Sequence, residues 1–144
     1  MAGTRTFLRY WLPALAWLVA VMFFSGETLA ATNTGAFLKG LTRALGLALS
    51  DETLLFIHFA IRKTAHVCVY ALLSALWFRA WRGANPGWRM QWALLALAVC
   101  MGTASADETR QAFTPGRGGS PWDVALDMSG ALLAQMVIAA RLRR

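Results

Sequence analysis

The stretch ASADETRQAFTPGRGGSPWDVALDMSG, residues 104–130, decides the fold predicted for this chain. It lies between two apolar runs and holds seven charged or amide side chains: Asp107, Glu108, Arg110, Gln111, Arg117, Asp123 and Asp127. The prolines and glycines of residues 115–121 predict a non-helical loop in its middle. Two of its acids lie where a membrane helix should already have begun, and ionisable groups inside the membrane are costly and are therefore functional by default. We expect a charged hairpin between two membrane helices, and a functional site there.

The composition predicts an all-α membrane protein of one domain, residues 1–144. Hydrophobic residues make up 58% of the chain and charged residues 15%, against about 45–50% and about 25% in soluble domains. The net charge is +7, but the basic residues punctuate apolar runs and form no nucleic-acid-binding motif. We therefore expect membrane lipids as partners and no nucleic acid.

Four apolar segments predict transmembrane helices, at about residues 10–26, 61–79, 90–106 and 122–140. The first follows Arg5 and Arg9, so a cleaved signal peptide is an alternative for it. Its tryptophans and phenylalanines and the poor cleavage pattern at Leu29-Ala30-Ala31 favour a membrane helix. Residues 51–60 are expected as an outer lead-in to the second span.

Residues 36–49 predict a short amphipathic helix outside the membrane core. Apolar side chains recur there at helical spacing: Phe37, Leu38, Leu41, Leu45 and Leu49. Such a helix lies in the membrane interface or packs on the bundle as a linker, and the sequence leaves both open.

Positive-inside counting predicts cytoplasmic termini and an antiparallel bundle of four helices. One side then holds eight basic residues and no acid: Arg5, Arg9, Arg79, Arg82, Arg89, Arg141, Arg143 and Arg144. The other side holds the remaining six basic residues and all seven acids, so the hairpin of residues 107–121 lies outside. The predicted location is the bacterial cytoplasmic (inner) membrane.

Helix rise converts sequence spacing into depth, with the cytoplasmic arginines as the floor. His66 and Asp127 then lie about 20 Å above it, and Arg62, Asp107 and Asp123 about 26 Å above it. Arg62, His66, Tyr70 and Leu73 share one helix face; Asp123, Asp127, Gly130 and Ala134 share another. Gly130 and Ala134 also permit close helix approach. These spacings predict one polar pocket, open to the outer leaflet, built by three helix ends.

Several of these residues have structural alternatives. Arg62 and Lys63 are candidates for snorkelling to headgroups, and His66 for a hydrogen bond that pairs helices. Asp123 is a candidate N-cap of the last helix, and Arg117 a loop cation that pairs only with Asp123. Asp127 lies too far inside the helix to cap it.

Two motif blocks resemble the VanZ-like family of small bacterial membrane proteins. The first is Arg62-Lys63-x-x-His66-x-x-x-Tyr70-x-x-Leu73. The second is Asp107-Glu108-x-x-Gln111-x-Phe113-x-Pro115-Gly116-Arg117, followed by Asp123-x-x-x-Asp127-x-x-Gly130. The chain departs from the family pattern at Val69, where an acid is frequent, and at Asp127, where asparagine is common.

The resemblance implies a multi-pass membrane protein that alters sensitivity to teicoplanin, a lipid-bearing glycopeptide, or that serves cell-envelope homeostasis. It implies a ligand-binding set of ten residues: Arg62, Lys63, His66, Tyr70, Asp107, Glu108, Gln111, Arg117, Asp123 and Asp127. It does not assign a reaction.

Three functions remain open. The first is binding of an anionic envelope lipid or lipid-linked cell-wall precursor, because arginines hold oxyanions well. The second is an intramembrane enzyme that modifies such a lipid, with acid–base candidates His66, Asp107, Glu108 and Asp127. The third is a structural or partner-binding membrane protein. The sequence names no cofactor and no metal ligands, although a site of histidine and acids also suits a divalent cation.

Overall fold

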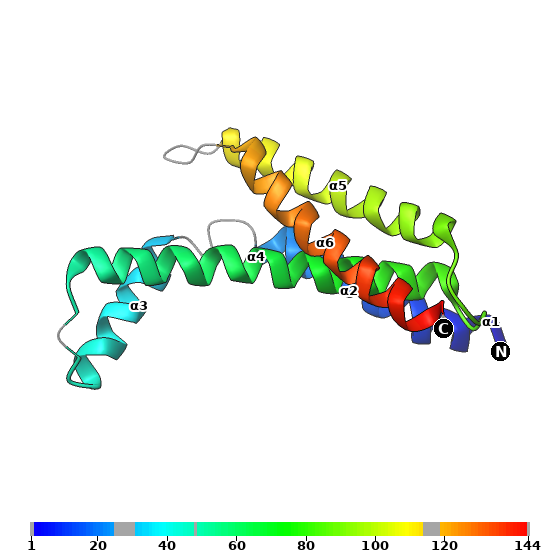
Figure 1. The fold of residues 1–144 in the computed structure, drawn as a ribbon, viewed down its shortest axis with the longest axis horizontal. Helices are drawn as coiled ribbons and strands as arrows, with labels where there is room; N and C mark the ends of the chain where they lie inside the picture. Colours follow the sequence, from blue (N-terminus) through cyan, green and yellow to red (C-terminus); the bar gives the residue numbers. More distant parts are fainter. Residues whose placement is uncertain (1, 25–30, 48, 114–118, 144) are drawn as a thin grey trace.

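The computed structural model describes residues 2–24, 31–47, 49–113 and 119–143. These residues fold mainly into helices, namely α1 (Ala2–Thr6), η1 (Phe7–Trp11), α2 (Leu12–Phe24), α3 (Ala31–Ala44), α4 (Asp51–Arg82), α5 (Met90–Ala112) and α6 (Pro121–Leu142). Figure 1 shows α6 crossing α4, α5 lying beside α6, α2 running behind α4, and both termini at the same end of the molecule.

The first helical run changes its winding before the proline at position 13. Pro13 has no N–H, so the carbonyl of Arg9 has no donor four residues ahead, and an α-helix would bring the proline ring against that carbonyl. The segment η1 is a π-helix, in which the Leu12 N–H instead bonds to the carbonyl of Phe7, five residues back. The wider turn thus accommodates the proline and fixes where Tyr10 and Trp11 lie.

The outer helix α3 begins and ends earlier than the predicted segment 36–49. Gly46 adopts a positive φ of 69°, which a residue with a side chain rarely takes. The Gly46 N–H bonds to Arg43 and the Leu47 N–H to Thr42, the paired bonds of a Schellman motif. The expected helical register through Leu45 and Leu49 is therefore wrong, because the glycine ends the helix at Ala44.

Helix α4 is one continuous element of 32 residues, about 48 Å long. Ser50 caps it by accepting a hydrogen bond from the Thr53 N–H at 3.2 Å, and Asp51 and Glu52 suit its positive end. The predicted lead-in of residues 51–60 is thus the first part of the same helix. Since α4 exceeds the roughly 30 Å of a hydrocarbon core, part of it must extend beyond the membrane or tilt.

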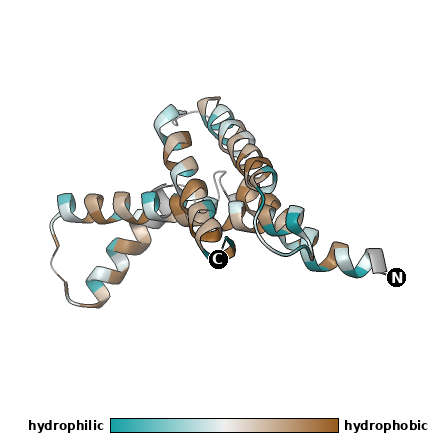
Figure 2. Cartoon of the chain, turned by 45° about the vertical axis from the view of Figure 1, so that its right-hand side comes forward, coloured by the Kyte–Doolittle hydropathy of each residue, from teal (hydrophilic) through white to brown (hydrophobic). Residues whose placement is uncertain are grey.

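The described chain hides polar groups and exposes apolar ones. Buried polar side chains include Ser74, Thr103, Asp107, Asp127 and Gln135. Exposed apolar side chains follow the outside of the helices: Val19, Phe23, Leu94, Leu95, Leu132, Leu133, Met136 and Val137. Figure 2 shows that hydrophobic residues occur along most of the length of the packed helices. This distribution suits a protein surrounded by lipid.

Three segments of the described chain are long and apolar enough to cross a membrane: Thr4–Phe23, α4 and α6. The predicted third span at residues 90–106 lies in α5, which is not among them because its last turns carry polar residues and acids. The four-span bundle and its orientation therefore stay predictions.

Helices α4 and α6 approach each other most closely at Gly130. A Cβ atom on this glycine would lie 2.2 Å from the backbone carbonyl oxygen of Val67. The absence of a side chain therefore brings the two backbones together, as the small-residue spacing predicts. This contact holds the faces of His66 and Asp127 against each other.

Candidate functional site

A cleft of about 420 Å³ opens between α4 and the first turn of α6. One wall is apolar, made by Leu55 and Phe59, and the rest is polar: His58, Arg62, Lys63, His66 and Asp123. Six of the seven lining residues recur three or four apart on one face of α4, which is why a single helix supplies most of the cleft. The lining therefore combines apolar surface with two permanent cations.

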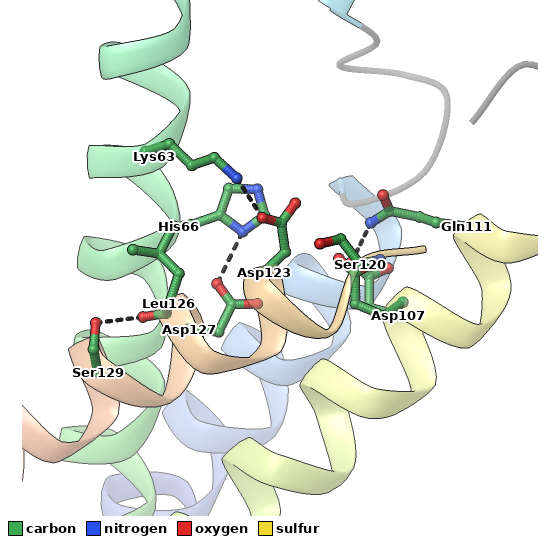
Figure 3. Close-up of polar contacts among 10 residues, drawn as sticks. Lys63, His66, Asp107, Gln111, Ser120, Asp123, Leu126, Asp127 and Ser129 are labelled. Atoms are coloured by element: carbon green, nitrogen blue, oxygen red, sulfur yellow. Dashed lines mark hydrogen bonds and ion pairs between the residues drawn. The ribbon is translucent and has the colours of Figure 1, made fainter. Parts of the chain in front are cut away.

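One ion pair and one hydrogen bond between a histidine and a carboxylate connect the cleft-lining face of α4 to α6 (Figure 3). The Lys63 ammonium donates to the Asp123 carboxylate. One helical turn deeper, His66 Nδ1 lies 2.9 Å from Asp127 Oδ1. The Asp127 side chain is 2% exposed and that of His66 27% exposed. An ionised carboxylate only accepts hydrogen bonds, so with Asp127 ionised and the imidazole neutral, His66 Nδ1 carries the proton and Nε2 is left for a ligand.

The acids of α5 form a second group beside the cleft. Asp107 accepts hydrogen bonds from Arg110 at 2.8 Å and from Gln111 at 2.7 Å, both on its own helix. Arg110 also donates to the backbone carbonyl of Met22 at 2.8 Å. The pairing thus ties the end of α5 to the end of α2.

Glu108 fixes the start of α6 on α5. Its Oε2 accepts a hydrogen bond from the Ser120 N–H at 2.5 Å, while its Oε1 is buried and has no partner among the described residues. Gly119 passes so close that a Cβ atom on it would lie 2.5 Å from the Glu108 carbonyl oxygen. The carboxylate therefore meets the positive end of the α6 dipole, which it stabilises.

A further polar row lies below the His66–Asp127 contact, between α4 and α6. Gln135 Nε2 donates to Ser74 Oγ at 2.8 Å and to the Ser74 carbonyl at 3.2 Å. Tyr70 is buried above them, and its hydroxyl has no partner in the described part of the chain. In lipid such interhelical bonds hold helices together, so this row has a structural role.

The predicted shared depth of His66 and Asp127 is confirmed by their contact. The prediction of one pocket built by three helix ends is met only in part, because Asp107, Glu108 and Gln111 do not line the cleft. The N-cap role of Asp123 is wrong: α6 begins at Pro121 with Ser120 as its N-cap, and Asp123 pairs with Lys63. Arg117 and its pairing lie outside the described residues.

Sequence reasoning missed two residues of this region. His58 lines the cleft, and its place four residues before Arg62 on the same helix face was a usable signal. Arg110 pairs with Asp107, and its spacing of three residues on one helix indicated that contact. Both follow from helical periodicity once α4 and α5 are drawn as unbroken helices.

The chemistry available at the cleft is oxyanion binding and proton transfer. Arg62 lines the cleft and makes no ion pair among the described residues, so its guanidinium remains for an outside anion. No three histidine, cysteine or acidic side chains of residues 2–24, 31–47, 49–113 and 119–143 are grouped to hold a metal ion.

The family profile described as VanZ/LLP1 matches residues 10–142. This chain belongs to the VanZ/LLP1 family. The match covers every candidate site residue of this VanZ/LLP1 protein, including both residue pairs that connect α4 to α6. Searches of curated proteins and of solved structures found no match. The residues that line the cleft of this family member therefore indicate the class of its ligand.

Proposed function

We propose that this protein binds the anionic headgroup of an envelope lipid or lipid-linked cell-wall precursor in the cleft between α4 and α6. The carrying observation is the lining itself: Arg62, which makes no ion pair among the described residues, stands beside Lys63, with Leu55 and Phe59 along the same face. A guanidinium matches phosphate and carboxylate geometry, and the apolar wall suits an acyl or prenyl chain. The ligand class is thus an amphiphile with an oxyanion.

The depth predicted from the sequence supports access to the cleft from the membrane. At the predicted depth, Arg62 lies about 26 Å above the floor set by Arg79, near the outer edge of a hydrocarbon core of about 30 Å. A protein that holds the headgroup of an envelope lipid in this cleft would change how a lipid-tailed glycopeptide engages the cell surface. This supports a role in teicoplanin sensitivity or in envelope homeostasis on the extracytoplasmic side.

The test is native mass spectrometry of protein extracted with its membrane lipids. We expect wild type to retain one selective anionic lipid, and Arg62→Gln to retain about tenfold less of it, because one charge-assisted contact is lost. Arg43→Gln removes an exposed arginine of α3 outside the cleft and is the matched control. Equal retention by Arg62→Gln and wild type would contradict the proposal.

An enzymatic role is the second candidate, and the His66–Asp127 geometry favours it. A buried carboxylate that holds Nδ1 orients the imidazole, so that Nε2 faces the cleft as a general base. An enzyme predicts that wild type alters the bound lipid chemically, whereas His66→Ala retains it intact. His58→Ala, which also changes a histidine of the cleft lining, should leave the chemistry unchanged.

A purely structural role predicts a different result. In that case His66→Ala and Asp127→Ala would lower protein abundance, and well-folded wild type would retain no selective lipid. The abundance of each variant is therefore measured with its lipid content.

A further inference from the structure

A second cationic feature lies at the opposite end of α4 from the cleft. The guanidinium carbons of Arg9, from η1, and Arg79, from α4, each lie 5.5 Å from the centroid of the Tyr10 ring. Both arginines are exposed. Arg79 is seventeen residues from Arg62, about 26 Å along the helix. This tyrosine-centred pair is therefore separate from the cleft.

Neither arginine has an ion-pair partner among the residues that the structure describes. All seven acids of the sequence are at positions 27, 51, 52, 107, 108, 123 and 127, on the cleft side of the predicted topology. The ion pairs among the described residues use Lys39, Lys63 and Arg110 as their cations. Both guanidinium groups lie near the same ring and carry positive charge, so an anion from outside would be attracted to this end of the molecule.

Aromatic side chains lie between the group of Arg9, Tyr10 and Arg79 and the rest of the helix bundle. Trp11, next to Tyr10, packs edge-on against Trp81 at 4.8 Å and Trp77 at 6.1 Å between ring centroids. The indole Nε1 atoms of Trp77 and Trp81 are buried and have no acceptor among the described residues. Tryptophan and tyrosine favour the level where headgroup meets acyl chain. The end of α4 thus presents cations beside an aromatic wall.

We propose that Arg9 and Arg79, positioned by the Tyr10 ring, bind the phosphodiester group of an anionic phospholipid in the leaflet at this end of the molecule. Guanidinium forks bind phosphate oxygens bidentately, and basic pockets between membrane helices recognise lipid headgroups. A signal for membrane orientation alone would need only positive charge. The shared ring and the π-helical turn that places it are geometric features beyond that need.

The test replaces arginine by lysine, which keeps the charge and therefore the orientation signal but removes the guanidinium fork. Purified protein in detergent is titrated with dioleoylphosphatidylglycerol, with dioleoylphosphatidylcholine as the neutral comparison, and bound lipid is counted by native mass spectrometry. We expect Arg9→Lys and Arg79→Lys each to weaken phosphatidylglycerol binding about tenfold. Wild type should prefer phosphatidylglycerol to phosphatidylcholine.

Arg143→Lys is the matched control, since its guanidinium lies 3.9 Å from the centroid of a different ring, that of Trp88. It should leave phosphatidylglycerol binding unchanged. An equal loss in Arg143→Lys would show a diffuse field of charge and overturn the site, as would unchanged binding in Arg9→Lys and Arg79→Lys. Thermal unfolding of each variant identifies a folding defect. If Arg79→Lys has one, Arg9→Lys on the exposed η1 segment decides the question.

Discussion

At the scale of single residues, the two polar contacts between α4 and α6, Lys63–Asp123 and His66–Asp127, differ in their burial. The carboxylate of Asp127 is 2% exposed and that of Asp123 25% exposed. Water screens the Asp123 pair more strongly, and exposed ion pairs contribute little to stability. The deeper pair, beside the Gly130 contact, therefore contributes more to holding the two helices in register.

We predict that Asp127→Ala destabilises the folded protein by about 2 kcal/mol, because a hydrogen bond to a buried charged group is lost. Asp123→Ala, its matched control one turn away, should cost no more than about 1 kcal/mol. The measurement is unfolding of the purified protein in mixed micelles by titration with sodium dodecyl sulfate. If the two variants unfold at the same midpoint, burial does not govern the strength of these pairs.

At the scale of elements, the crossing of α4 and α6 depends on a backbone contact. Nothing but hydrogen fits at Gly130, where the Val67 carbonyl oxygen is in the way. Gly102, on α5, has no atom within 4 Å of the position of its missing Cβ. Close packing of α4 on α6 therefore requires a glycine at position 130, whereas no packing contact requires one at position 102.

We predict that Gly130→Ala lowers the free energy of unfolding by about 1–3 kcal/mol through overpacking and weakens lipid retention in the cleft by shifting His66 from Asp127. Gly102→Ala should leave stability unchanged or raise it by up to about 1 kcal/mol, since alanine restricts the unfolded chain. Micelle unfolding and native mass spectrometry measure the two effects. A Gly130→Ala protein as stable as Gly102→Ala would show that the helices need not approach so closely.

At the same scale, the exposed apolar side of α3 favours one of its two predicted environments. Phe37 is 71% exposed and Leu41 44% exposed, and none of the described α3 residues lines the cleft. Lys39 pairs with Asp51 at 2.8 Å and ties α3 to the start of α4. Since this side is not packed on the bundle, lying in the membrane interface suits it better than the linker role.

At the scale of the whole molecule, the two ends of the bundle have opposite characters. The described acids and the cleft lie toward the α3 end of the molecule, whereas the end with both termini carries Arg9, Arg79 and the cluster of Trp11, Trp77 and Trp81 (Figure 1). This asymmetry is what the positive-inside rule describes, and it makes the orientation testable with two exposed positions.

We predict that a membrane-impermeant maleimide labels Glu52→Cys in intact cells and labels Asn85→Cys only after the membrane is opened. The background carries Cys68→Ala and Cys100→Ala, because Cys68 is exposed and free. Labelling of Asn85→Cys in intact cells would reverse the orientation and place the cleft in the cytoplasmic leaflet.

The sequence by itself determined the helical class, the apolar runs, the motif residues and the shared depth of His66 and Asp127. Helical period and rise are constant, so spacing along the chain converts directly into face and height. The same rule also explains the failures. The ends of α3 and α5 and the start of α6 depend on local hydrogen bonds of Gly46, Glu108 and Ser120, which periodicity does not contain.

Only the tertiary structure decided which charges meet. Lys63, and not Arg62, pairs with Asp123; the acids of α5 pair outside the cleft; and the Tyr10 ring gathers two arginines distant in sequence. These contacts depend on how the helices rotate and cross, and the rotation is set by packing at Gly130, Val67 and the tryptophan cluster. Side-chain spacing within one helix carries no information about that rotation.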